Sequence, residues 1–163
     1  VPTVTALNGA AAGAGANLAL AADIVIAKSS AYFVQAFSRI GLIPDVGGTY
    51  FLPRAMGLAK SIGSSIFADK IMAAEAHEIG LIYEYVEDDN YDIHLKSRVE
   101  YLANGPTVAF AGIKTAMRKS LNNSLDEQLE LEAKLQKKCG NTRDFQEGVL
   151  AFHEKRDAKF EGR

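Results

Sequence analysis

The sequence predicts an α/β protein whose first part mixes strands with helices and whose second part is entirely helical. Short β-favouring segments alternate with an alanine-rich helical segment near the start of the chain. The acidic, polar stretch "EDDNYD", residues 87–92, marks a boundary, and only helical patterns follow it. We therefore expect an α/β region over residues 1–90 and a helical region over residues 91–163. The 163 residues, of which 48% are hydrophobic, suffice for a buried core.

The first region predicts a β, helix, β succession within about 30 residues, which suits a layered α/β fold. The expected elements are, in order, a strand in "TVTAL" that ends at the turn signal Asn8-Gly9, a short buried helix in "ANLALAA", a strand in "DIVIA", a strand in "AYFVQAF", a helix in "AMGLAKSIGSSIF", a short helix in "AAEAHEIG" and a strand in "LIYEYV".

The second region predicts four helices. One covers about 91–103 and a second begins at Pro106, a favourable first helical residue. A third begins at the capping-box pattern from Ser124 to Glu127. The fourth begins near residues 141–142, and we expect its apolar stripe to be buried, at a contact between subunits. That stripe consists of Phe145, Val149 and Phe152.

Composition excludes several classes of protein. A net charge of −2 without a basic run gives no sign of nucleic-acid binding. No apolar stretch reaches the roughly 18 residues of a membrane span, so no membrane partner is expected. The single cysteine, Cys139, allows no internal disulfide and fits a reducing cytoplasm, where we expect the protein to reside. The three histidines lie in helical, charged contexts, and we expect no metal.

The chain opens with "VPTVTALNG", which predicts a strand already inside a fold. We therefore expect that an amino-terminal portion, which would carry part of any site, is missing.

The segment "NGAAAGAGANLAL" is the first candidate for chemistry. A helix amino terminus presents unpaired N–H groups, and Gly13 and Gly15 would let a ligand oxygen approach the backbone around Ala14. This arrangement is typical of an oxyanion hole. Dinucleotide binding is disfavoured because Leu18 stands where a third glycine is required. A tight helix–strand packing turn remains the structural alternative.

The second candidate is Asp45 in "GLIPDVGGTY". An aspartate between a proline and two glycines is either a cap of the following helix or a proton-transfer group aimed at a substrate. A carboxylate together with backbone donors suits proton abstraction next to a carbonyl, with the enolate held by the donors.

Four segments together resemble the enoyl-CoA hydratase/isomerase (crotonase) family over essentially the whole chain. They are "NGAAAGAGANLALAADIVIA", "FSRIGLIPDVGGTYFLPR", "AAEAHEIGLIYEYV" and "RDFQEGVLAFHEKRDAKFEGR". The resemblance implies a ββα spiral, of which residues 1–90 are the carboxy-terminal part. It also implies a helical oligomerisation region that forms a homotrimer or a dimer of trimers. The substrate would be an acyl-CoA thioester, with no further cofactor.

The resemblance also implies site residues. The Ala14 N–H would hold the thioester oxygen, and Gly13, Gly15 and Gly48 would line the substrate site. Family hydratases carry two glutamates that handle water, whereas this chain has Asn17 and Phe37 at those positions. Asn17 would contact the substrate, and Phe37 would be either an apolar wall for it or simple core packing.

The pattern "PDVGG" is similar to that of the ring-1,2-epoxyphenylacetyl-CoA isomerases of phenylacetate degradation, in which the aspartate is the acid/base. The resemblance therefore implies an isomerase that uses Asp45 and Ala14. Such an enzyme moves a double bond or rearranges a ring epoxide. A hydratase or lyase using Asp45 alone, and a non-catalytic acyl-CoA-binding member of the family, remain the alternatives.

Overall fold

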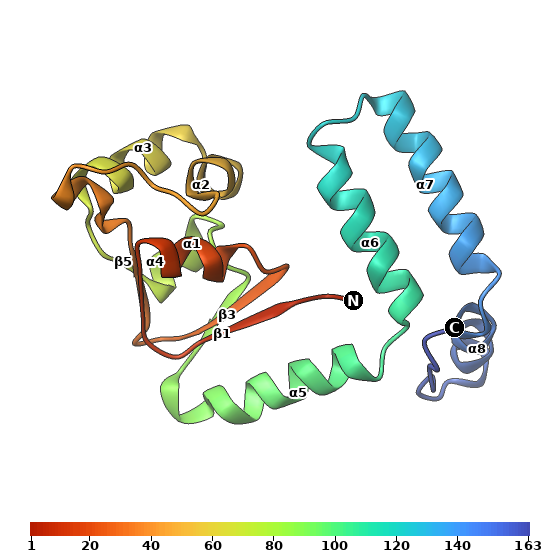
Figure 1. Ribbon diagram of the computed structural model, residues 1–163. Coiled ribbons are helices and arrows are strands. Elements are labelled where there is room, and N and C mark those ends of the chain that lie inside the picture. The colour runs from red at the N-terminus through yellow and green to blue at the C-terminus, as the bar shows by residue number, and fades with distance from the viewer. The chain divides into compact units, whose positions relative to one another are not determined.

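The computed structural model describes residues 1–163 and divides into two compact units. One unit comprises Thr3–Lys96, and the other comprises Ser97–Arg163 together with Val1–Pro2. Helix α5 (Tyr91–Ala103) begins at the boundary that we expected from the sequence, and the division falls inside this helix. The first unit carries every strand and the second carries only helices and a tail, as Figure 1 shows.

Two small sheets form the first unit. Strands β1 (Val4–Leu7), β3 (Ile24–Lys28) and β6 (Glu84–Val86) make a parallel sheet in the order β1-β3-β6. The second sheet has the order β2-β4-β5, in which β2 (Ala10–Ala12) runs parallel to β4 (Tyr32–Val34), and β5 (Ile71–Met72) runs antiparallel to β4.

The first four strands alternate between the two sheets, and this alternation makes that part of the chain a spiral. Strand β1 joins the first sheet and β2 the second, and helix α1 (Ala14–Leu20) follows. Strands β3 and β4 then repeat the same step, each beside its counterpart from the previous turn. This ββα repeat is the partial crotonase-like spiral that the resemblance implied, so the expected fold class is confirmed.

The remaining elements of this unit are helical: the 3₁₀ helix η1 (Ala36–Ile40), α2 (Gly48–Met56), α3 (Leu58–Phe67), α4 (Ala73–Glu78) and the 3₁₀ helix η2 (Asp88–Asn90). The helix predicted over residues 55–67 is wrong at its start, because Gly57 has a φ of 77° and separates α2 from α3. The strand predicted over residues 31–37 ends at Val34.

The core of this unit is built around small side chains. The largest fully buried apolar residues of this unit are Phe33, Ile26 and Leu52, and alanines make up much of the cluster that contains Phe33 and Leu52. Because alanine adds little volume, the helices can approach the short strands closely at native packing density. The full set is Ala11, Ala16, Val25, Ala27, Ala31, Phe33, Leu52, Met56, Ile71, Ala73, Ala76, Leu81 and Ile82.

The second unit contains α6 (Thr107–Ser120), α7 (Leu125–Gly140) and α8 (Arg143–Glu154). The predicted capping box at the start of α7 is present, with Ser124 and Glu127 bonding each other's backbone N–H. The α8 stripe is not buried within this chain, since Phe145 and Phe152 are 53% and 81% exposed, and its burial at a contact between subunits stays a prediction. None of the helices is both long and apolar enough to span a bilayer.

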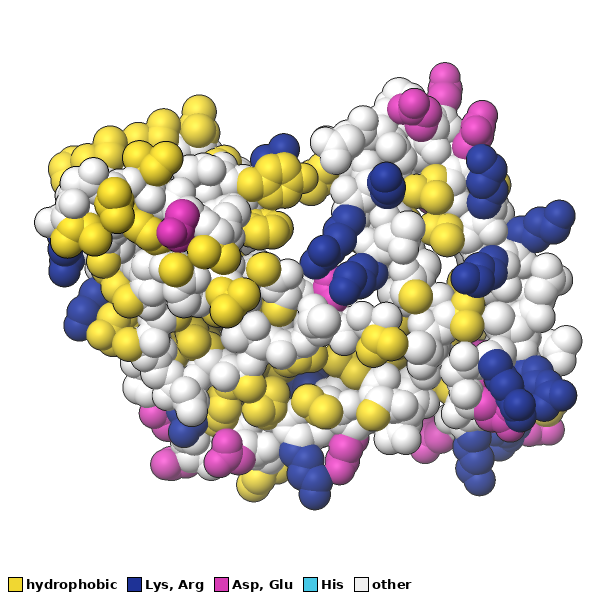
Figure 2. Space-filling model, in the orientation of Figure 1, with side chains coloured by type: hydrophobic (Ala, Val, Ile, Leu, Met, Phe, Trp, Pro, Cys, Tyr) yellow, Lys and Arg dark blue, Asp and Glu magenta, His cyan; other side chains and the backbone are white.

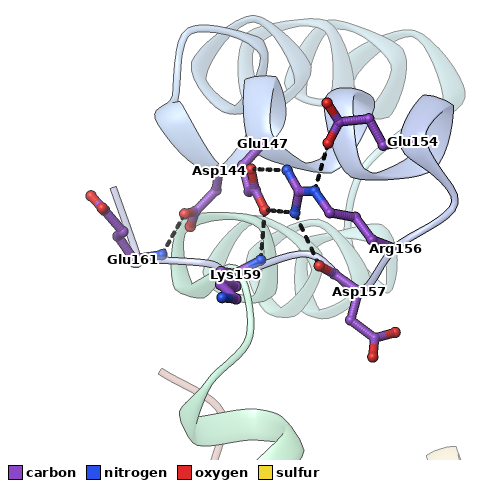
Figure 3. Close-up of polar contacts among 7 residues, drawn as sticks. All are labelled: Asp144, Glu147, Glu154, Arg156, Asp157, Lys159 and Glu161. Atoms are coloured by element: carbon purple, nitrogen blue, oxygen red, sulfur yellow. Dashed lines mark hydrogen bonds and ion pairs between the residues drawn. The ribbon is translucent and has the colours of Figure 1, made fainter.

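The tail after α8 is fastened by two carboxylates of that helix (Figure 3). Asp144, almost fully buried, accepts hydrogen bonds from the backbone N–H groups of Glu161 and Gly162, at 2.7 and 3.0 Å. Glu147 accepts two bonds from the Arg156 guanidinium, at 2.6 and 3.0 Å, and one from the backbone of Lys159, at 2.8 Å.

Candidate active site

The amino terminus of α1 leaves a backbone N–H without a helical acceptor. Gly13 caps this helix with a φ of 52° and a ψ of −127°, a conformation that favours glycine. Its N–H is used by the second sheet, because it donates to the carbonyl of Val34 at 2.9 Å. Ala14 is the first helical residue, so no helical carbonyl accepts its N–H. Ala14 and Gly15 are both exposed, which leaves their backbone accessible to a ligand.

Phe37 lies beneath this helix start. Only 8% of its surface is exposed, and a Cβ added at Gly13 would lie 3.6 Å from the Phe37 ring. The ring therefore packs against the backbone of the glycine turn. This position supports the core-packing alternative for Phe37, and a wall for substrate remains a prediction.

Asp45 begins a tight turn with an unusual backbone. Its carbonyl accepts the N–H of Gly48 at 2.8 Å, and the two central residues, Val46 and Gly47, have φ values of 48° and 78°. Positive φ at both central positions is the pattern of a type I′ turn. A β-branched residue such as Val46 is strained there, at a cost of order 1–3 kcal/mol. Such strain gathers at functional sites, so the turn itself points to Asp45.

Asn17 connects the two candidate features. It lies one helical turn after Ala14 with no exposed surface, and its side-chain Nδ2 donates to the Asp45 carbonyl at 2.9 Å. Its Oδ1 accepts a hydrogen bond from Gln35 Nε2 at 2.8 Å. A buried amide thus fixes the start of α1 against the turn that carries the aspartate.

Gly48 makes room for that amide. A Cβ added at Gly48 would lie 2.3 Å from Asn17 Nδ2, far inside van der Waals contact. Gly48 is therefore required by the packing of Asn17, and the contact with substrate that we expected of both residues remains a prediction.

The Asp45 side chain is exposed in this chain, and the neighbouring Leu42 and Ile43 are exposed as well. Figure 2 shows hydrophobic side chains gathered over α2 and α3, the helices that follow this turn.

The sequence did not single out two residues of this arrangement. Gln35 is 3% exposed and orients Asn17, but a lone glutamine after a strand gives no signal. Val46 was also given no role of its own. A valine between an aspartate and two glycines, in a turn that needs positive φ, was the available clue.

Two histidines and one aspartate outside this arrangement have structural partners. His77 Nδ1 lies 2.9 Å from the carbonyl oxygen of Tyr83, and His94 Nε2 lies 2.9 Å from a Glu84 carboxylate oxygen. Asp88 is exposed and accepts bonds from the hydroxyl and the backbone N–H of Ser30, and these bonds lower the pKa of its carboxyl. No group of three His, Cys, Asp or Glu side chains is arranged to hold a metal ion.

Comparison with known proteins identifies the family. The model of the enoyl-CoA hydratase/isomerase family matches residues 1–163. The chain belongs to the enoyl-CoA hydratase/isomerase family. It is 55% identical over its whole length to a protein of Rhodobacter capsulatus named "Probable enoyl-CoA hydratase", of which it covers 63%. Over 99% of its length it is 45% identical to the 1,2-epoxyphenylacetyl-CoA isomerase of Escherichia coli, of which it covers 62%.

Solved structures agree with the fold. A crystal structure from Mycobacterium abscessus that carries the same family description, enoyl-CoA hydratase/isomerase, superposes with a TM-score of 0.95. It is 40% identical, and the match covers 100% of this chain and 63% of that one. The chain thus spans a little under two thirds of the length of the relatives that it matches.

Proposed function

We propose that the protein is an acyl-CoA isomerase in which Asp45 is the acid/base and the Ala14 N–H stabilises an enolate. One observation carries the proposal: the buried Asn17 amide joins the helix start that bears Ala14 to the strained turn that bears Asp45. A polarising N–H and a proton-transfer carboxylate are the two groups that proton abstraction beside a thioester requires.

The reaction follows from these two groups. The Asp45 carboxylate removes a proton from the carbon next to the thioester carbonyl of an unsaturated acyl chain. The negative charge then develops on the thioester oxygen, where the Ala14 N–H donates to it. The protonated Asp45 returns the proton to a carbon farther along the conjugated system. The double bond has then moved, and the enzyme is restored with no change in overall composition. In a ring-epoxide substrate the same pair of groups would assist rearrangement.

The residues at positions 17 and 37 favour isomerisation over hydration. Addition of water needs groups that hold and deprotonate a water molecule. Neither the buried amide of Asn17 nor the buried ring of Phe37 can take up a proton in this way. The relatives' names do not separate the two reactions, since one relative is named a hydratase and another an isomerase. A hydratase or lyase that uses Asp45 alone is therefore the second candidate.

The decisive variant is Asp45→Asn in the full-length protein. We expect its turnover of trans-3-hexenoyl-CoA to fall by about 10²–10⁴-fold, because an amide cannot carry the proton. The control is Asp69→Asn, which changes another exposed carboxylate of the same unit and should leave turnover unaltered. Full activity of Asp45→Asn would contradict the proposal.

Rapid addition of water to crotonyl-CoA by the unaltered protein would favour the second candidate. A cytoplasmic homotrimer, or a dimer of trimers, stays a prediction.

A further inference from the structure

We propose that Asn17 and Gln35 form a buried amide pair whose task is to position the Asp45 turn, residues 45–48, for proton transfer. The inference rests on the proposed function. Both residues are positioning residues: their side chains are 0% and 3% exposed and act through the Asp45 backbone.

The orientation of the pair is dictated from the Asp45 end. A carbonyl oxygen can only accept, so Asn17 must turn its Nδ2 toward Asp45, and the 2.9 Å distance joins these two atoms. Asn17 Oδ1 then faces Gln35, which must answer with its own Nε2. Gln35 Oε1 is consequently left as a buried acceptor with no hydrogen-bond partner. The Asp45 carbonyl thus fixes the orientation of Asn17, Asn17 fixes that of Gln35, and the Gln35 Oε1 atom is left unpaired.

This pair is a poor choice for stability alone. A buried acceptor without a partner costs free energy, whereas two apolar side chains of similar volume would fill the same space without that cost. Gly48 adds a second cost to stability, because a glycine inside helix α2 is less favourable than an alanine, and only a residue without a side chain leaves room for the Asn17 amide. What the pair supplies in return is one hydrogen bond, and that bond ends on Asp45.

The turn needs such a bond because its backbone is strained. Val46 has a φ of 48°, and a turn with a β-branched residue in this region relaxes if its surroundings allow. The Asp45 carbonyl accepts from both Gly48 N–H and Asn17 Nδ2, so both of its lone pairs are engaged. The bond to Gly48 lies within the turn, and only the bond to Asn17 ties the turn to the helix that bears Ala14.

Loss of the hydrogen bond between Asn17 and the Asp45 carbonyl should lower kcat more than it changes KM. The direction of the Asp45 carboxylate follows from its backbone, and a misplacement of about 1 Å in a reacting group can cost about 10²-fold in rate. Asn17→Leu keeps the branched shape of the side chain and removes only its donor and acceptor. We expect this variant of the full-length protein to lose about 10- to 100-fold in kcat on trans-3-hexenoyl-CoA, with little change in KM.

A double variant separates positioning from general damage. If Asn17 acts through the Asp45 carboxylate, Asn17→Leu should have almost no further effect on kcat in an Asp45→Asn background. If the two losses simply multiply, the positioning role is refuted. Gln35→Met tests the second member of the pair. It keeps Asn17 but removes the donor that orients it, so an intermediate loss of kcat is expected, and it takes over the test if Asn17→Leu does not fold.

A structural readout tests the pair without any activity. The Gly48 N–H bonds the Asp45 carbonyl, and the Ser61 N–H bonds the Gly57 carbonyl at the start of α3, so both amides report on local opening. Hydrogen exchange should become about tenfold faster at Gly48 in Asn17→Leu while the rate at Ser61 stays the same. Unchanged exchange at Gly48 would overturn the inference. Faster exchange at Gly48 combined with a fully active Asp45→Asn would instead leave the positioning intact and refute the proposed function.

Discussion

Two irregular segments of this chain are each held by side chains, and they are held in opposite ways. The turn at residues 45–48 is fixed by the buried, uncharged amide of Asn17, while the tail at residues 155–163 is fixed by the carboxylates of Asp144 and Glu147. Both segments contain a residue with positive φ that is not glycine, namely Val46 at 48° and Lys155 at 52°. Lysine tolerates that conformation better than a β-branched valine does.

The difference teaches what each device can do. A neutral amide does not gain or lose a proton near neutral pH, so the bond from Asn17 to the turn stays the same as the pH changes. Charged groups give stronger bonds in partly exposed places, and Figure 3 shows Arg156 held between Glu147 and Glu154. Such a fastening suits a tail, because it is strong near neutral pH and can be released by acid.

Among variants that test this comparison between the turn and the tail, Gly48→Ala should have the largest effect. The added Cβ would lie 2.3 Å from Asn17 Nδ2 and would push the buried amide away from the Asp45 carbonyl. We expect kcat to fall about 10²-fold and the protein to melt at a lower temperature, as in an overpacked core. Gly63→Ala is the control, because nothing lies within 4 Å of the Cβ it adds in helix α3. Equal behaviour of the two variants would mean that the turn does not depend on Asn17.

Asp144→Ala should have the next largest effect, on stability. It leaves the N–H groups of Glu161 and Gly162 without their acceptor. We expect a loss of about 1–3 kcal/mol in the free energy of unfolding, together with faster proteolysis of the tail. Asp126→Ala is the matched control, since it also removes an acid from the first turn of a helix but none that bonds the tail. An equal loss in both variants would reduce Asp144 to a favourable helix-dipole charge.

Val46→Gly should shift stability by a smaller amount and in the opposite direction. Glycine adopts a φ of 48° without strain, so removing the β-branched side chain should stabilise the fold by about 1 kcal/mol, less the entropy that glycine loses on folding. Thermal unfolding measures the change. A clear drop in melting temperature would show that the Val46 side chain contributes more by packing than it costs in strain.

The smallest effect is expected from acid acting on Glu147. The bonds from Arg156 and Lys159 lower the pKa of its carboxyl from 4.5 to about 2. Because the folded pKa is depressed, the stabilisation is complete above about pH 4.5 and disappears as the pH falls toward 2. Hydrogen exchange of the Lys159 N–H should therefore accelerate over this range in the unaltered protein. In Glu147→Gln it should be fast already at neutral pH, and a slow rate there would contradict the assignment.

Local signals in the sequence were sufficient for much of the fold. The capping box at Ser124 and the turn at Asn8-Gly9 depend on neighbouring residues alone, and both predict an element boundary that the structure has. The three-residue strand β2 and the two-residue strand β5 escaped prediction because they are too short to show a period. They exist only because β4 lies between them.

The candidate site could be proposed from the sequence, but the bond that connects its two parts could not. A glycine-rich helix start and an aspartate in a constrained turn each suggest chemistry from residue type alone. The bond that unites them joins Asn17 to Asp45 across 28 positions, and no local pattern reports such a pair. Asn17 and Gly48 were expected to line a substrate site. The structure shows that Gly48, which has no side chain, accommodates the Asn17 amide, and the contact of both residues with substrate stays a prediction.

The separation of Asn17 and Asp45 in the sequence also affects the order in which the chain folds. Strands β3 and β4 and the helix η1 all lie between Asn17 and Asp45, so the Asn17 amide and the Asp45 carbonyl can meet only after a full coil of the spiral has closed. Under the proposed function, a chain that has gained its helices and strands but not this closure would look native by circular dichroism and yet lack activity. Catalytic activity would then be gained last during folding and lost first in mild denaturant.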